Sequence, residues 1–289
     1  MVRLYGGELT TLDSRKVSIK IRSSMIYIPL VIYVIFCLYP LYFTINTSLQ
    51  EHAEIFSIPP KVIFKPTLKS YVKVLTMYGF TDFMMNSLVA VTSSVALAMA
   101  LGIPCAYVLS RYDIPRKRDI AYNILTFRFL PPIAIAIPLY LYYIKIKIYD
   151  TVAGLSLIYV VMNLPYTVWL ARGFFLAIPK ELEEAAELDG CSKLEVFLRI
   201  TLPLSLHGLA STALLCFILT WNEFLLALIL TGMNARTLPV QSLKFAEAMG
   251  LDWGALCAAA TIILLPPIAM GIFLRKYIIR GLTFGAIKG

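Results

Sequence analysis

The amino-acid sequence predicts an all-α membrane protein with six transmembrane helices. Hydrophobic residues make up 59% of its 289 residues and charged residues only 15%, and the mean hydropathy is +0.78. Ordinary soluble domains are about 45–50% apolar and about 25% charged. Long runs without charged residues recur along the chain, and each can supply the about 20 apolar residues of a spanning helix. Such a chain cannot cover its apolar surface with polar groups, so we expect it to lie in a bilayer.

Six runs carry the predicted spans, which are residues 23–50, 83–110, 120–144, 151–171, 206–231 and 253–274. The first run is too long for the apolar part of a signal peptide, which predicts an uncleaved anchor. Residues 1–22 are predicted to form a loosely ordered arm, and residues 23–289 one transmembrane domain. Between the first two spans, residues 49–82 are polar and predict a loop or a short surface helix. Prolines fall within nearly every run, and we expect them to bend the helices.

The distribution of basic residues predicts the orientation. An even number of spans puts both termini on one side, and 17 of the 26 lysines and arginines fall in the segments of that side, against eight on the other. The side richer in lysine and arginine is normally cytoplasmic. We therefore expect a multi-pass protein of the cell membrane with both termini in the cytoplasm. The same bias accounts for the net charge of +9 without a nucleic-acid partner.

Several classes of function lack their sequence signals. No glycine is followed by lysine, so the chain has no Walker A loop for nucleotide binding. Two histidines and five scattered cysteines predict neither a catalytic metal site nor a disulfide framework. An ion-coupled secondary transporter would show matching halves and several buried acids, and a membrane enzyme would show a catalytic constellation at one face. The secondary transporter is the weaker alternative, because only Glu223 fits it.

The largest loop on the basic side, residues 178–205, predicts two short helices. Pro179 suits the first position of a helix, and Gly190 suits a left-handed stop. Ser192 and Glu195 have the spacing of a capping box that begins a second helix, which we expect to run to Pro203.

Each of these two helices has a predicted apolar face, formed by Leu182, Ala185 and Ala186 on the first and by Leu194, Phe197 and Leu198 on the second. An apolar face outside the bilayer indicates a protein partner or the membrane surface. The alanines favour a partner with a groove.

The same loop resembles the EAA loop of ABC importer permeases. The matching positions are Glu184, Ala185, Ala186, Gly190, Ile200, Leu202 and Pro203. Residues 126–140, 221–231, 237–240 and 275–289 are further similar to the maltose-type sugar permeases, and especially to the smaller, six-span subunit of that family. The likeness covers essentially residues 20–289.

This resemblance implies a type I ABC importer permease, in which the chain is a pore-forming subunit and is not itself an enzyme. It implies a heterodimer with a second permease subunit, two ATPase subunits, an external solute-binding protein, a sugar as substrate and no cofactor. The EAA residues, with Asp189, would couple the pore to the ATPase. In the external loop 232–252, Thr237, Leu238 and Pro239 would contact the binding protein. The alternative solute is another polar molecule, such as a polyol or glycerol phosphate.

Polar residues within the spans are candidates for contact with the solute, because they are costly in a bilayer. They are Asn163, Trp221, Asn222 and Glu223. A structural role, such as a hydrogen bond between subunits, is the alternative for Asn163 and Glu223. Arg128 lies roughly 12 Å and Glu223 roughly 25 Å from the basic side at the rise of a straight helix. We therefore expect no direct ion pair between them.

Overall fold

The computed structural model describes residues 8–59, 61, 63–77, 79–243 and 252–284, which are mainly helical and contain no strand. In chain order the helices are α1 (Glu8–Ser48), α2 (His52–Ile55), α3 (Lys69–Met77), α4 (Phe80–Arg111), α5 (Lys117–Thr126), the 3-10 turn η1 (Phe127–Phe129), α6 (Pro132–Lys145), α7 (Val152–Ala177), α8 (Glu181–Leu188), α9 (Lys193–Val196), the π-helical segment η2 (Phe197–Thr201), α10 (Leu202–Trp221), α11 (Leu225–Leu230), α12 (Leu238–Ser242) and α14 (Trp253–Phe284).

Within this described part of the chain, five segments are long and apolar enough to cross a membrane, and a bent pair makes six if it counts as one span. The five are Tyr27–Ser48, Phe80–Arg111, Val152–Ala177, Lys193–Trp221 and Trp253–Lys276, and the bent pair is Lys117–Phe129 with Pro132–Lys145. The structure thus agrees with the predicted all-α class and its series of spans. It differs from the prediction at the third and fifth spans.

The third span is not one helix but two, which meet at 85°. Leu130 between them has an extended backbone, with φ −66° and ψ 120°. The residue before a proline avoids the helical region, and the tandem Pro131 and Pro132 cannot donate to the helical ladder. The bend expected from the prolines is therefore present, and it divides the third span into two helices.

The fifth span was predicted too far along the chain. It runs from Lys193 to Trp221, and the apolar residues that follow form the separate helix α11. Glu223 lies at the break, and its carboxylate caps the start of α11 by accepting the amides of Leu226 at 2.9 Å and Ala227 at 3.0 Å.

The segments outside the spans also differ in part from the prediction. Residues 8–22 belong to α1 and are not a loose arm, while residues 1–7 lie outside the described part. The 49–82 segment contains the short helices α2 and α3, as expected.

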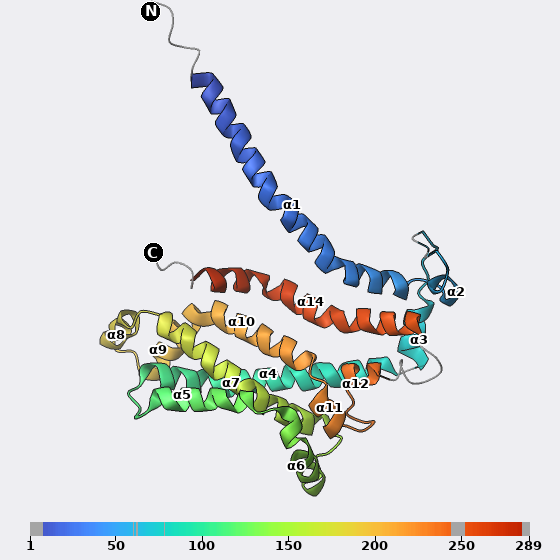
Figure 1. Ribbon diagram of the computed structural model, residues 1–289. Helices are drawn as coiled ribbons and strands as arrows, with labels where there is room; N and C mark the ends of the chain where they lie inside the picture. The colour runs from blue at the N-terminus through green and yellow to red at the C-terminus, as the bar shows by residue number, and fades with distance from the viewer. Residues whose placement is uncertain (1–7, 60, 62, 78, 244–251, 285–289) are drawn as a thin grey trace, which may run out of the picture.

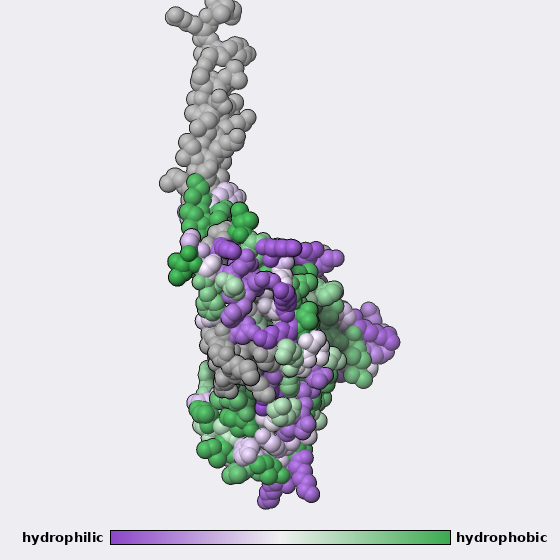
Figure 2. All heavy atoms as spheres, turned by 90° about the vertical axis from the view of Figure 1, so that its right-hand side faces the viewer, coloured by the Kyte–Doolittle hydropathy of each residue, from purple (hydrophilic) through white to green (hydrophobic). Residues whose placement is uncertain are grey.

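The helices form a bundle with two distinct ends (Figure 1). Helices α4 and α7 pack along each other, and α10 packs on both of them and on α14. Helix α1 begins away from the body of the bundle, and its later part packs along α14. Helix α8 marks one end, here called the α8 end, and α3, α11 and α12 lie at the other, the α12 end. Figure 2 views the α12 end and shows hydrophilic residues gathered across it, with hydrophobic residues along its flanks.

Candidate functional site

The turn between α8 and α9 is defined by backbone hydrogen bonds. Gly190 has the left-handed φ of +91°, as predicted. Its amide donates to the carbonyl of Glu187, and the amide of Cys191 donates to the carbonyl of Ala186, both at 3.0 Å. This pair of bonds is the Schellman motif, which satisfies the last carbonyls of a helix.

The predicted capping box is present at the start of α9. The Ser192 amide donates to Glu195 Oε2 at 2.9 Å, and the Glu195 amide donates to Ser192 Oγ at 3.4 Å. The first helix begins at Glu181, two residues after Pro179. Together the two caps fix the angle between α8 and α9.

The second helix does not end at Pro203, contrary to the prediction. It passes through the π-helical segment η2 and continues as α10 to Trp221. A proline in an α-helix clashes with the carbonyl four residues earlier, which here belongs to Arg199. The wider π turn at Phe197–Thr201 lies at this point, and such turns are frequent at functional sites. The 178–205 loop is therefore continuous with a spanning helix.

The apolar face of the loop also differs from the prediction. Ala185 is exposed, but Ala186 is buried against the chain's own body, with 7% of its surface exposed. Apolar residues are exposed on both short helices of the loop, and we call five of them the loop patch: Leu182, Ala185, Leu188, Leu194 and Leu198. Leu188 is the most open of them at 89% exposure. A helical protein end normally does not expose this much leucine, so the patch indicates a partner.

The remaining EAA positions divide into exposed and packed residues. Glu184, Asp189 and Pro203 are exposed, whereas Ile200 and Leu202 are partly buried. Leu202 packs against the core cluster of α4, α5 and α7 at this end. The exposed residues are available to a partner, and the buried ones hold the loop on the bundle.

A buried ion pair, missed in the sequence, holds α8 on the bundle. Glu183 Oε1 accepts from Arg111 Nε at 2.8 Å, and both side chains are less than a tenth exposed. Thr201 of η2 donates to the same oxygen at 2.7 Å, and Tyr107 of α4 donates to Oε2 at 3.4 Å. Arg111 also donates to the carbonyl of Ile178 at 3.0 Å. We call this set the Glu183 clamp.

The clamp joins the end of α4, the start of α8 and the π segment η2. Removing one partner of such a pair leaves an uncompensated charge and costs about 3–5 kcal/mol. In the sequence Glu183 is one of three acidic residues in a first helical turn, where anions are common. Its pairing with Arg111 sets Glu183 apart from the other two acidic residues. Arg111 is far away in the sequence, so only the folded structure reveals this contact.

Two of the candidate solute contacts are packed inside the chain. Asn163 is 2% exposed and exchanges hydrogen bonds with Thr220 Oγ1 at 2.8 and 3.0 Å. Trp221 is 2% exposed, donates to the Ile263 carbonyl at 3.0 Å and stacks on Phe217. Their polar atoms are therefore used in joining α7, α10 and α14.

The other two candidates lie at the break after α10. Asn222 is exposed, and Glu223 is partly buried, with Tyr159 donating to its Oε2 at 3.3 Å. Arg128 stacks on the ring of Tyr166, 5.1 Å from its centre. Arg128 and Glu223 line the same small cavity. The different distances from the basic side of the membrane that were expected for straight helices did not predict this. The bent third span brings them near each other, although no ion pair between them forms in the described structure.

The segment expected to contact a binding protein is largely buried. Thr237 is 3% and Leu238 0% exposed, Pro239 is partly buried, and the Leu238 amide donates to Ser87 Oγ at 2.8 Å. Of the expected loop 232–252, residues 244–251 lie outside the described part.

Asp150 fixes the turn that precedes this segment. Its carboxylate accepts from the amides of Gly232 at 2.7 Å, Ala235 at 2.9 Å and Asn234 at 3.2 Å, and from Asn234 Nδ2 at 2.9 Å. Burial by itself would raise the pKa of Asp150, but these hydrogen bonds outweigh it and hold the pKa below the ordinary aspartate value. Residues 231–236 are thereby tied to the α6–α7 connection.

Comparison with known proteins identifies the family. The family described as binding-protein-dependent transport system inner membrane component matches residues 98–283. The chain is 38% identical over 251 residues to a probable ABC transporter permease protein, y4oR, of Sinorhizobium fredii, covering 87% of this chain and 90% of that one. It is 34% identical over 269 residues to the trehalose/maltose transport system permease protein MalG of Thermococcus litoralis, covering 92% and 96%.

The fold agrees with this result. A bacterial ABC transporter involved in the import of the acidic polysaccharide alginate contains a chain that matches with a TM-score of 0.73 at 21% identity, over 96% of this chain and 100% of that one. This likeness confirms the importer-permease fold, and the sequence matches confirm the resemblance that the EAA positions indicated. The chain therefore belongs to the binding-protein-dependent transport system inner membrane components, the permease subunits of ABC transporters.

Proposed function

We propose that this permease is one of two pore-forming subunits of an ATP-driven sugar importer, and that its 178–205 loop docks on a separate ATPase subunit. The observation that carries the proposal is the exposed loop patch on a helix pair held by the Glu183 clamp. Membership in a binding-protein-dependent family supports the division of labour. The ATPase hydrolyses ATP, and this chain converts the resulting movement into opening of the pore.

The α8 end is the cytoplasmic end in this proposal. The excess of lysine and arginine in the segments of that side supports it. Both chain termini lie in the cytoplasm, and the α12 end faces the external binding protein.

The coupling contact is made by the exposed residues of the loop. Leucines of the patch enter a groove of the ATPase, and Ala185 allows the two backbones to approach closely. Glu184, Asp189 and Gly190 lie at the exposed edge of the same helix end. Because the clamp joins α8 to α4 and to the π segment before α10, movement of the ATPase is passed to two spanning helices.

A sugar is the proposed solute. The permeases from Thermococcus litoralis and Mycobacterium tuberculosis, each 34% identical to this chain, are described as trehalose/maltose and trehalose transport proteins. Within this chain, Asn222 and Glu223 are the proposed pore contacts, because an amide and a carboxylate can both bind hydroxyl groups. A polyol or glycerol phosphate is the alternative solute.

Two neighbouring alanines provide the test of the docking contact. Ala185→Trp adds bulk on the exposed face and should reduce the amount of ATPase that copurifies with the permease, without lowering the permease Tm. Ala186→Trp adds the same bulk inside the chain and should lower the Tm, because overfilled cores are destabilised. Lys193→Ala is the control, since its exposed ion pair with Glu187 contributes little. Normal ATPase retention in Ala185→Trp would contradict the docking contact.

The solute is tested by transport. Proteoliposomes that contain the complete transporter and its purified binding protein should take up labelled trehalose or maltose when ATP is supplied to the cytoplasmic side. Uptake of labelled glycerol phosphate, but of neither sugar, would favour the alternative.

A further inference from the structure

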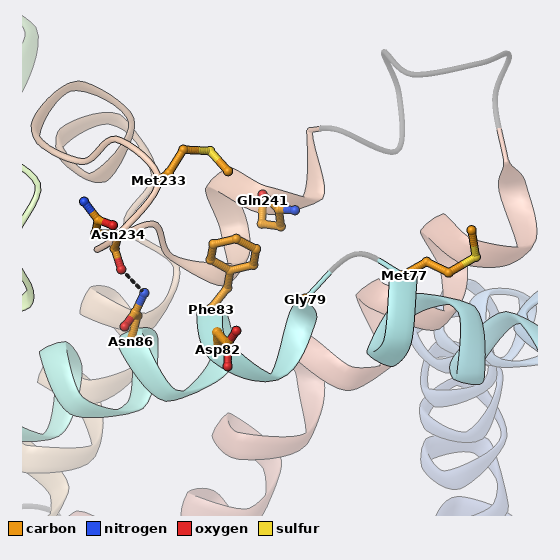
Figure 3. A pocket seen from close by; sticks show the side chains of 8 residues that line it. All are labelled: Met77, Gly79, Asp82, Phe83, Asn86, Met233, Asn234 and Gln241. Atoms are coloured by element: carbon orange, nitrogen blue, oxygen red, sulfur yellow. Dashed lines mark hydrogen bonds between the residues drawn. The ribbon is translucent and has the colours of Figure 1, made fainter.

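A cavity opens at the α12 end, on a surface that the coupling function does not use. Its volume is about 540 Å³, and it lies between the end of α3, the first turns of α4 and the 232–241 segment. The lining residues are Met77, Gly79, Asp82, Phe83, Asn86, Met233, Asn234 and Gln241. In Figure 3, Phe83 rises from α4 toward Met233 and Gln241, and Asn86 points to Asn234.

The walls of the cavity are fixed by hydrogen bonds within the chain. Asn86 Nδ2 donates to the carbonyls of Asn234 at 2.7 Å and Arg236 at 3.2 Å. Asp150 holds the amides of the same turn from the other side. A wall that is already ordered lowers the entropy cost of binding a partner.

The cavity offers one available negative charge. Asp82 is exposed, and its carboxylate forms no hydrogen bond or ion pair with any residue in the described ranges. Nearby charged groups are already engaged, since Lys73 pairs with Asp252 at 2.6 Å and Arg236 donates to the Gly232 carbonyl at 3.0 Å. The other polar lining groups are neutral amides. The charge of the site therefore complements a cation.

The rim favours the aliphatic stem of a basic side chain. Met77 is 73% and Met233 58% exposed, and methionine adapts its shape to a partner surface. Lysine and arginine pack their stems on apolar surface while the charged head reaches a polar group. Phe83 is only 8% exposed and presents no open ring face for stacking of a sugar.

We propose that this cavity receives a lysine or arginine at the tip of a loop of the external binding protein, with Asp82 as its ionic partner. The inference rests on the proposed function, which places the α12 end outside the membrane. It replaces Thr237 and Leu238 as direct contacts, because the fold buries them. These two residues instead pack beneath the wall of the cavity.

The test measures ATP hydrolysis by the reconstituted complete transporter as its purified, sugar-loaded binding protein is titrated. Asp82→Lys should raise the KM for the binding protein about tenfold or more, because like charges oppose docking. Asp82→Asn should raise it less and should weaken the dependence of KM on salt concentration. The control is Asp113→Lys, which reverses an exposed carboxylate on the α4–α5 connection at the α8 end, where it pairs with Lys117. Reversal of one lysine or arginine on the binding protein should restore the KM of Asp82→Lys.

The outcomes separate the docking site from the proposed function. If the wild-type transporter responds to the binding protein and Asp82→Lys has the same KM, the docking site is overturned and the function stands. If the wild-type complex does not respond at all, the proposed function fails. If trehalose or maltose without binding protein protects an Asp82→Cys variant from thiol labelling, the cavity is a sugar site and the docking proposal is overturned.

Discussion

At the scale of single residues, one buried and one partly buried carboxylate hold segments of this permease in place. Glu183 holds α8 against α4, and Asp150 holds the 231–236 turn against the α6–α7 connection. Each accepts several hydrogen bonds from groups that are far away in the sequence. A carboxylate can do this because it has two oxygens and about four acceptor positions. Neither residue needs to touch the solute or a partner to affect transport.

The Glu183 clamp predicts non-additive mutations. Glu183→Leu and Arg111→Met should each lower the Tm strongly, because each leaves one buried charge without its partner. The double variant should lose less than the sum of the two single losses, since no charge is then left unpaired. The measurement is thermal unfolding of the purified complex, with the exposed Glu181→Gln as control. Additive losses would show that the pair is not coupled.

Asp150 predicts a pH dependence. Its folded pKa lies below the unfolded value of about 3.9, so its stabilisation is complete above that pH and is lost as the pH falls through the folded pKa. Asparagine also tolerates the positive φ of 55° at this position, so Asp150→Asn leaves the backbone unstrained. Its side-chain amide, however, points an N–H donor at the backbone N–H donors of the turn. We expect a loss of about 1–2 kcal/mol at pH 7, shrinking at lower pH. The measurement is thermal unfolding at pH 7 and at a pH below the unfolded pKa of about 3.9, with Asp113→Asn as the control. A constant difference across pH would contradict the assigned role.

At the scale of the elements, helix caps and breaks decide the shape of the coupling loop. The Schellman turn at Gly190 ends α8, and the capping box at Ser192 begins α9. The π segment η2 then lets the chain pass Pro203 into α10. The loop is therefore the beginning of a spanning helix, and a force on α8 acts directly on that helix.

Gly190 provides a test of the turn. A Cβ added at Gly190 would have no heavy atom within 4 Å, so the only cost of Gly190→Ala is its left-handed backbone, about 1 kcal/mol. Gly173→Ala is the matched control, because it also meets open space but lies in a helix. Gly190→Ala should reduce ATPase stimulation by the binding protein, Gly190→Asn should reduce it less, and Gly173→Ala should leave it at the wild-type level. Equal stimulation in all three variants would mean that the turn geometry does not matter for coupling.

At the scale of the whole molecule, this chain alone leaves large apolar surfaces uncovered. Most side chains of α1 between Tyr27 and Phe43 are exposed, with Phe36 at 75%. Within its described helix, α1 contacts only α14 extensively. Such a helix requires lipid or another apolar protein surface to cover it, as expected of a membrane protein.

The orientation of the whole molecule can be tested with thiol labelling. A variant whose only cysteine is Cys191 should react with an impermeant reagent in inside-out vesicles from which the ATPase has been removed, and not in intact cells. A second variant with Lys65→Cys as its only cysteine, on the exposed 49–82 segment, should show the opposite pattern. Labelling of Cys191 from outside would reverse the proposed topology.

The sequence by itself determined the features that depend on local chemistry. Apolar runs of spanning length predicted the helices, because the bilayer sets their length whatever their neighbours. The stop at Gly190 and the capping box at Ser192 and Glu195 were also predicted, since their hydrogen bonds join residues a few positions apart. The EAA positions indicated the family for the same reason, because they form a fixed local pattern.

Only the tertiary structure decided the features that join distant residues. It paired Glu183 with Arg111, turned Ala186 inward, buried Thr237 and Leu238, and brought Arg128 and Glu223 to one cavity. Even the start of α11 depended on which amides the Glu223 carboxylate could reach. A periodic pattern shows which side of a helix is apolar, but not whether another part of the chain or a partner covers it. That choice follows from packing, which minimises exposed apolar surface and unpaired buried charge over the whole molecule.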